Sequence, residues 1–328
     1  MSQLTRAFGR RGFTFGVGAA GLAALAARRG FAAAKEKEKD RAAAGGLSIG
    51  YAAYPWGDHA QQSITDIAAA GYPGIQLRLN ILKEYATPEA LKAELAKAHL
   101  TFACLSGGGP KADPATRAAE IDKFMTGAKF ARAAGALMAQ VTSPSRGNVE
   151  KIARADLKPF AETLTELGKR TAEIGLPLAF HNHMGQIGQN PDEVDAILEM
   201  SDPKYVKLLL DTGHYAAAGG DPVKAIKTHG KRLGLLHIKD VKDKAPGTPT
   251  DSKPTADGKP AAPDNKKYLF VELGQGKVDF KAVFAALRAV SFKGWVMIEL
   301  DTTPPGGTPK ASAITNKAFL EKTLGLAV

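Results

Sequence analysis

Short apolar runs alternate along the chain with longer stretches whose apolar residues recur at helical spacing. From Leu47 onward, eight such runs have the length of buried strands. They cover residues 47–54, 74–79, 101–107, 136–143, 177–183, 206–214, 233–240 and 294–301. The pattern therefore predicts an alternation of strands and helices.

The intervening stretches carry helix start signals. Thr87 precedes a proline in the first helical turn, and Asn190 and Asp221 are residues that commonly cap helix N-termini. Four apolar side chains within 157–175 fall on one helix face. We expect helices over 87–99, 113–135, 157–175, 190–200, 221–230, 279–290 and 310–324.

Eight strands that alternate with about eight helices over about 280 residues predict a single-domain (β/α)8 TIM barrel. The alternative is a doubly wound open sheet, which normally has a glycine-rich phosphate loop after its first strand. Residues 55–63 follow the first run and contain no such loop. The glycines after the third run, "SGGGP", are more typical of a turn. The barrel is therefore the expected fold, over residues 47–328.

The first 34 residues predict export. They contain a twin arginine in "GRRGFTF", a weakly apolar run of about 15 residues, and "FAAA" ending at Ala34. A charged region, an apolar region and a small-residue cleavage site describe a secretory signal, and the twin arginine favours the Tat route. We expect a signal peptide over 1–34, a periplasmic protein, and no stable membrane insertion after cleavage. A disordered basic leader or an uncleaved anchor are the alternatives.

The formal net charge is +11, but 1–34 holds five arginines and no acidic residue, so removing it leaves +6. This balance is weak support for nucleic-acid binding, and we expect no nucleic-acid partner. Residues 35–46 are a charged spacer. One cysteine excludes an intramolecular disulfide. The oligomeric state is left open, with a homo-oligomer among the alternatives.

One segment interrupts the alternation. Residues 242–267 hold five prolines and no large apolar residue, so they are expected to form a disordered surface insertion. The insertion follows the seventh run, on the side of a barrel where active sites lie. A tolerated insertion is one interpretation, and a lid or partner contact is the other.

Polar side chains gather where the last four runs end. Active sites of such barrels lie at the C-terminal ends of the strands. The first four runs end without His, Asp or Glu, whereas the fifth to eighth end in His181 and His183, Asp211 and His214, His237, Lys239 and Asp240, and Glu299 and Asp301.

These strand ends are neighbours in a barrel, and residues two apart on a strand share a face. His181 and His183 should therefore lie together, as should His237 and Lys239, and Glu299 and Asp301. A lone strand-end histidine is more often structural, but four histidines beside carboxylates predict a metal site. The mixed donors suit Mn²⁺, Co²⁺, Zn²⁺ or Fe²⁺. His59, in the first loop, is a weaker candidate for the same site.

Six motifs in order give the chain a resemblance to a known family. They are "GYPGIQLR", "FHNHMG", "LLLDTGH", "LLHIKD", "ELGQGKVDF" and "GWVMIEL". Over residues 47–327 the chain resembles the xylose isomerase-like TIM-barrel superfamily, the sugar phosphate isomerase/epimerase group. The "HNHMG" element is most similar to the inosose dehydratase branch.

The resemblance implies one bound divalent ion, Mn²⁺ above all. In the ketose 3-epimerase branch the ion is held by Glu, Asp, His and Glu, and the last three match Asp211, His237 and Glu299. His181 stands where the first glutamate, a ligand and a base, would be. We therefore expect His181, Asp211, His237 and Glu299 as metal ligands. The base role then passes to Glu299, His183 or Lys239. Substrate contacts are expected from His214, His183 and Lys239.

The resemblance further implies proton abstraction beside a carbonyl, through an enediolate. We expect an isomerase or epimerase that acts on a keto-sugar or cyclitol, a small-molecule substrate. Export argues against a phosphorylated substrate. A dehydratase or lyase on the same scaffold is the first alternative. A non-catalytic sugar-binding protein is the second, and a nuclease of the endonuclease IV type, which needs more ligands than the first four strands supply, is the least favoured.

Overall fold

The computed structural model describes residues 46–245 and 267–328. The expected signal peptide, nearly all of the charged spacer and residues 246–266 of the insertion lie outside the described residues. No helix within these two ranges is long and apolar enough to cross a membrane.

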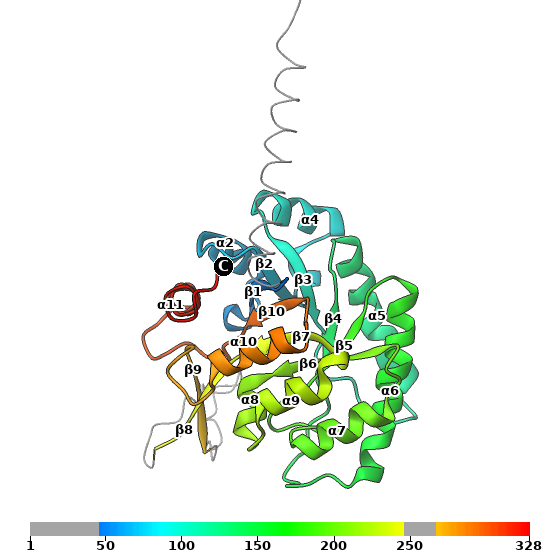
Figure 1. Cartoon of the computed structure of the whole chain (residues 1–328). Coiled ribbons are helices and arrows are strands. Elements are labelled where there is room, and N and C mark those ends of the chain that lie inside the picture. The colour runs from blue at the N-terminus through cyan, green and yellow to red at the C-terminus, as the bar shows by residue number, and fades with distance from the viewer. Residues whose placement is uncertain (1–45, 246–266) are drawn as a thin grey trace, which may run out of the picture. The chain divides into compact units, whose positions relative to one another are not determined.

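Eight parallel strands form a closed barrel, which confirms the predicted fold (Figure 1). In chain order they are β1 (Ser48–Ala52), β2 (Gly74–Arg78), β3 (Thr101–Ser106), β4 (Ala139–Val141), β5 (Leu178–His181), β6 (Val206–Asp211), β7 (Leu233–Ile238) and β10 (Trp295–Ile298). Parallel pairing of β1 with β10 closes the ring. Each strand lies within one of the eight apolar runs.

Helices surround the barrel on its outside (Figure 1). All seven expected helices are present: α4 (Pro88–Lys97), α5 (Arg117–Ala133), α6 (Arg154–Glu173), α7 (Pro191–Met200), α9 (Pro222–His229), α10 (Phe280–Ala289) and α11 (Pro309–Leu324). The predicted caps are formed, since Thr87 and Asp221 accept backbone N–H groups and Asn190 forms a capping box with Glu193. The structure adds α2 (Ala60–Ala69), α3 (Ile81–Glu84) and α8 (Thr212–Ala217).

The barrel has two apolar layers. A large cluster fills the space between strands and helices. A small cluster fills the interior, from Ala103, Cys104, Ala179, Leu209, Leu235 and Met297. Because side chains two apart on a strand share a face, the residues two positions after the last four of these also point inward. This interior cluster is therefore the floor on which the site is built.

One element was not expected. Strands β8 (Asp240–Asp243) and β9 (Tyr268–Val271) form an antiparallel hairpin beside the barrel, visible at the lower left of Figure 1. Lys242 and Asp243, which the sequence assigned to the disordered insertion, thus belong to a strand. They pair with Leu269 and Tyr268 on the far side of the insertion, so cross-strand hydrogen bonds define where the insertion leaves and re-enters the fold.

Candidate metal centre

The four predicted ligands lie at the C-terminal ends of adjacent strands. Each follows an interior residue by two positions: His181 after Ala179, Asp211 after Leu209, His237 after Leu235, and Glu299 after Met297. All four are buried. The strand alternation therefore brings them to one level at the top of the packed interior, as the sequence predicted.

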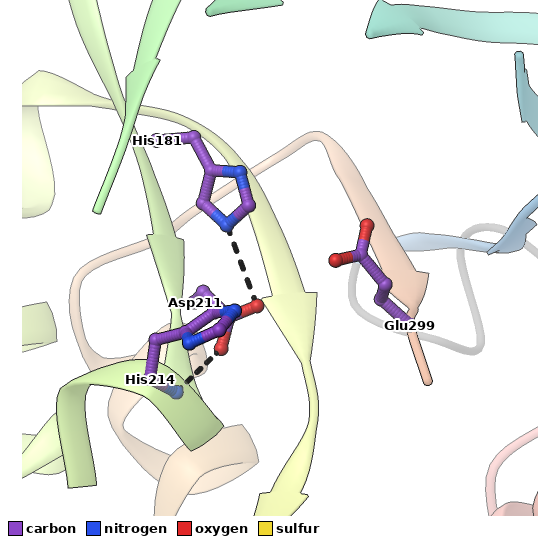
Figure 2. Close-up of side chains that lie close together, drawn as sticks. All are labelled: His181, Asp211, His214 and Glu299. Carbon is purple, nitrogen blue, oxygen red and sulfur yellow. Dashed lines mark hydrogen bonds and ion pairs between the residues drawn. The ribbon is translucent and has the colours of Figure 1, made fainter. Parts of the chain in front are cut away.

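Their polar atoms converge on one small space. Asp211 Oδ2 lies 3.4 Å from His181 Nε2 and 3.6 Å from His237 Nδ1, which in turn lies 3.2 Å from Glu299 Oε2. Figure 2 shows the Glu299 side chain on the side of this space opposite His181 and Asp211. The second Asp211 oxygen, Oδ1, accepts the backbone N–H of His214 at 2.8 Å and caps α8. Asp211 thus keeps Oδ2 free to face the cluster.

Several of these atoms are buried without a hydrogen-bond partner in the described part of the chain. They are both ring nitrogens of His181, Asp211 Oδ2 and His237 Nδ1. An unpaired buried polar atom is costly. The Nε2–H group of His237 donates to Gln76 Oε1 at 2.9 Å, so the Nδ1 lone pair faces two carboxylates. A cation between them would satisfy His181 Nε2, Asp211 Oδ2 and His237 Nδ1, so the donor set fits a bound metal ion.

The protonation states of these side chains also suit a bound metal ion. Burial lowers the pKa of His181 to about 4, which leaves its imidazole neutral at pH 7. Burial alone would raise the pKa values of Asp211 and Glu299. Lys239 and the surrounding histidines more than offset the effect of burial. The pKa of Asp211 is therefore well below its usual range, and the pKa of Glu299 is about 2. Imidazole nitrogens and carboxylates are typical ligands of a divalent transition ion.

His214 is close enough to replace His237 in the ligand set, since donor atoms of His181, Asp211, His214 and Glu299 all lie within 4.8 Å of one another. Its ring nitrogens, however, are already engaged. Nδ1 accepts the Met184 N–H at 3.2 Å, and Nε2 lies 3.0 Å from Lys239 Nζ. His237 has a free nitrogen and His214 has none, so the predicted set is the better one.

Lys239 is a buried cation beside the centre. Its Nζ lies 2.9 Å from Glu299 Oε1, 2.6 Å from Asp301 Oδ1 and 3.5 Å from Asp211 Oδ2. Burial lowers the pKa of Lys239, but the three carboxylates outweigh it and hold the pKa well above its ordinary value. The Phe270 ring of β9 covers the ammonium at 4.9 Å. Lys239 is therefore a fixed positive charge.

A second group of possible ligands contains His183, His214 and Asp301. The Lys239 ammonium already contacts two of them, at His214 Nε2 and Asp301 Oδ1, and so occupies the position of a second cation. His183 stacks on His214 with 3.8 Å between ring centroids, and its Nδ1 bonds to the Met184 carbonyl oxygen. The two histidines of "HNH" thus face the same site, as strand alternation predicted.

A cavity of about 460 Å³ opens above the centre. Of the predicted site residues, His181, His183 and Glu299 line it, while Lys239 and His214 are fully buried beneath it. The opposite wall comes from the ends of the first four strands and includes Tyr54, Arg78, Ser106, Gln140 and Thr142. Sequence reasoning missed this wall because it sought His, Asp and Glu. Position alone, at strand ends, was the available signal.

Two polar residues at the strand ends have structural roles. Asn182 joins β5 to β6, because its side chain exchanges two hydrogen bonds with the backbone of Asp211. Asp240 accepts the backbone N–H groups of Val241, Gly274, Gly276 and Val278. It therefore anchors the "LGQGKV" segment that follows the hairpin and takes no part in the cluster. His59 precedes α2 and does not line the cavity.

Comparison with known proteins agrees with this architecture. The chain is 28% identical over 280 residues to an inosose dehydratase from Lacticaseibacillus casei, which covers 81% of this chain and 90% of that protein. Among solved structures, the IOLI protein with a bound zinc atom superposes with a TM-score of 0.66 at 20% identity, covering 85% of this chain and 98% of the other. The 3-keto-D-glucoside 4-epimerase from E. coli superposes with a TM-score of 0.64 at 17% identity, covering 84% and 99%.

The family model described as a xylose isomerase-like TIM barrel matches residues 64–323, most of the chain. The matched range includes every predicted metal ligand and seven of the eight barrel strands. The chain belongs to the xylose isomerase-like TIM-barrel family.

Proposed function

We propose that the protein is a divalent-metal-dependent enzyme that removes water from a keto-cyclitol or keto-sugar. The observation that carries the proposal is the set of unpaired donor atoms on His181, Asp211 and His237, buried below a polar cavity. The similarity to an inosose dehydratase over 81% of the chain supports dehydration as the reaction. This reverses the preference for an isomerase that the sequence alone suggested.

His181, Asp211, His237 and Glu299 would hold the ion. A bound divalent ion would polarise a substrate carbonyl and stabilise negative charge that develops on its oxygen. Mn²⁺ is the expectation from the resemblance, and the zinc atom of the structurally similar IOLI protein makes Zn²⁺ the other candidate.

His183 is the best-placed general base. It lines the cavity, whereas Lys239 does not. Burial and then the nearby Lys239 charge lower the pKa of His183, so the ring is neutral and able to accept a proton at pH 7. We infer that it takes the proton α to the carbonyl and returns it to the departing β-hydroxyl. The C–H and C–O bonds break, a C=C bond forms, and water leaves.

Dehydration suits a base on one wall. Epimerisation returns the proton to the opposite face of the carbon and therefore needs a second group there. The wall from the first four strands contributes no histidine or glutamate among the described residues, and Asp58 at its rim is paired with Lys83 at 2.9 Å. Tyr54 lines that wall, and burial raises the pKa of its hydroxyl. A protonated Tyr54 could return a proton to the opposite face of the carbon. An isomerase or epimerase is therefore the second candidate.

The test is incubation of metal-loaded protein with inososes, keto-sugars and 3-keto-glycosides in D₂O. We expect deuterium at the α-carbon and loss of one water from a substrate, measured by NMR and mass spectrometry. His183→Gln should keep the metal and lose exchange. His229→Gln is the matched control, since His229, at the end of α9, pairs with Asp195 of α7 and does not line the cavity. If no substrate exchanged deuterium with either Mn²⁺ or Zn²⁺ bound, an enzyme of this class would be refuted and a sugar-binding protein favoured.

Export of the chain is a further proposal, which rests on residues 1–34 alone. Fractionation of cells that express the full chain tests it, with Arg10→Lys/Arg11→Lys as the variant. We expect the variant to stay in the cytoplasm and the parent chain to reach the periplasm. Equal distribution of the two would contradict the Tat route.

A further inference from the structure

Arg78 is held in a fixed position on the wall opposite the metal ligands. It ends β2 and lines the cavity. Its guanidinium carbon lies 5.0 Å from the centroid of the Tyr54 ring, and Nη1 donates to the Gly57 carbonyl oxygen at 3.3 Å. In the described ranges, no carboxylate forms an ion pair with it. An aromatic face and a backbone carbonyl thus orient a cation whose charge is left unneutralised.

Most of the donors of Arg78 remain open. A guanidinium carries five N–H groups in a rigid planar fork that matches a carboxylate. Among residues 46–245 and 267–328, only the carbonyl oxygen of Gly57 accepts a hydrogen bond from that fork. Asn80 donates to the same carbonyl oxygen at 3.2 Å, so the loop has a second anchor and does not depend on Arg78 alone.

The charges around the cavity favour an anionic ligand. At the floor, Asp211, Glu299 and Asp301 outweigh Lys239 by two negative charges, which one divalent ion would neutralise. At the rim, Arg78 and Lys83 outweigh Asp58 by one positive charge. With the ion bound, the cavity therefore carries a net charge of about +1.

We propose that Arg78 binds a carboxylate of the substrate through a bidentate pair, which makes the substrate a keto-sugar or cyclic polyol that bears one carboxylate. This inference rests on the proposed function, because the ion and Arg78 lie on opposite walls and would hold opposite ends of one molecule. Bidentate pairs of this kind are stronger than neutral hydrogen bonds and fix orientation as well.

Binding of unreactive probes tests the assignment without turnover. Zinc-loaded protein is titrated in a calorimeter with quinate, with its uncharged amide, and with an inositol monophosphate. Quinate is expected to bind about tenfold to a hundredfold more tightly than the amide, which is the range for a charged hydrogen-bonded pair. Tighter binding of the monophosphate than of quinate would overturn the carboxylate assignment.

Variants separate recognition from structure. Arg78→Gln should abolish the preference for quinate over the amide, and Arg78→Lys should retain part of it. Arg170→Gln removes the same charge from the outside of α6, where Arg170 pairs with Asp122, and should leave the preference intact. If Arg78 only tied the loops together, Arg78→Gln would weaken both ligands by one factor, and the proposal would fail.

The two proposals fail separately. If quinate is preferred but no keto compound exchanges deuterium, the dehydratase proposal is wrong and the role of Arg78 stands. If neutral inososes lose water and the two quinate ligands bind equally, the reaction stands and Arg78 has no carboxylate partner.

Discussion

His237 donates its Nε2–H to Gln76 Oε1 across the barrel interior, at 2.9 Å. The bond joins β7 to β2 and fixes which ring nitrogen faces Asp211 and Glu299. The Gln76 side chain is a neutral amide and cannot act as a base. Its position instead gives it the role of an outer partner that orients a metal ligand.

Replacing Gln76 with leucine should therefore weaken metal binding without touching a ligand. Loss of an outer hydrogen-bond partner of a ligating histidine typically lowers metal affinity about tenfold to a hundredfold. Competition of Zn²⁺ against a chromophoric chelator measures it. Gln140→Leu is the control, because Gln140 is a buried glutamine whose amide bonds to Ser106. Equal affinities in the two variants would remove the role assigned to Gln76.

Lys239→Met should destabilise the metal-free protein more than the metal-bound protein. It removes the ammonium and leaves Glu299 and Asp301 without their counter-charge beside Asp211. Breaking a buried ion pair costs about 3–5 kcal/mol. A bound divalent ion should reduce this cost, because its charge offsets the same carboxylates. Urea unfolding with a chelator and with Zn²⁺ measures both values.

The control for that variant is Lys277→Met. Lys277 pairs with Asp243 at the surface at 2.7 Å, where such a pair is worth at most about 1 kcal/mol. A Lys239 variant that unfolds like the Lys277 variant would show that the buried ammonium is not needed to balance the carboxylates.

The fold and the cluster of polar strand ends followed from two periodicities in the sequence, whereas the choice of four ligands within that cluster came from the family resemblance. Apolar runs separated by helical stretches located all eight barrel strands, and alternation placed His181 and Glu299 on the inner face. Strand-end position then grouped them, because neighbouring parallel strands bring their ends together. These rules are local, so a single sequence is enough to apply them.

Other features depend on contacts that local pattern does not encode. The pairing of Gln76 with His237 joins residues 161 positions apart. The β8–β9 hairpin was missed because a polar, proline-rich segment separates its strands, and Lys242 and Asp243 lack the apolar character of a strand. The burial of Lys239 below the cavity depends on three carboxylates from β6 and from the end of β10, so sequence reasoning placed it against the substrate instead.

Phe270 should stabilise the folded protein through the face of its aromatic ring. It lies 4.9 Å from Lys239 Nζ and packs edge-on against His214 at 4.6 Å. Phe270→Leu keeps the apolar bulk and removes the aromatic face, and a desolvated cation–π contact is worth about 2 kcal/mol. We expect the leucine variant to lose about that much unfolding free energy and Phe270→Tyr to lose little. A leucine variant as stable as the parent chain would reduce the contact to simple packing.

The metal-free protein should lose stability as the pH falls from about 6.5 towards 4. Burial lowers the pKa of His181 from 6.5 to about 4, and it lowers the pKa values of His183 and His214 as well. Below pH 6.5 the unfolded chain therefore binds protons that the folded chain does not, which favours unfolding. The contribution of His181 is unchanged above that range and is lost in full below about pH 4.

For His181 the difference corresponds to about 3 kcal/mol. The pKa of the Glu299 carboxyl is lowered from 4.5 to about 2, so its own loss falls between these values and mostly below the pH range of the measurement. Urea unfolding in chelator at half-unit steps from pH 7.5 to 4.5 gives the slope. His181→Gln cannot titrate and should have a shallower slope than the parent chain, whereas His229→Gln, on the exposed ion pair with Asp195, should not. Parallel slopes for all three proteins would mean that His181 is not held neutral by burial.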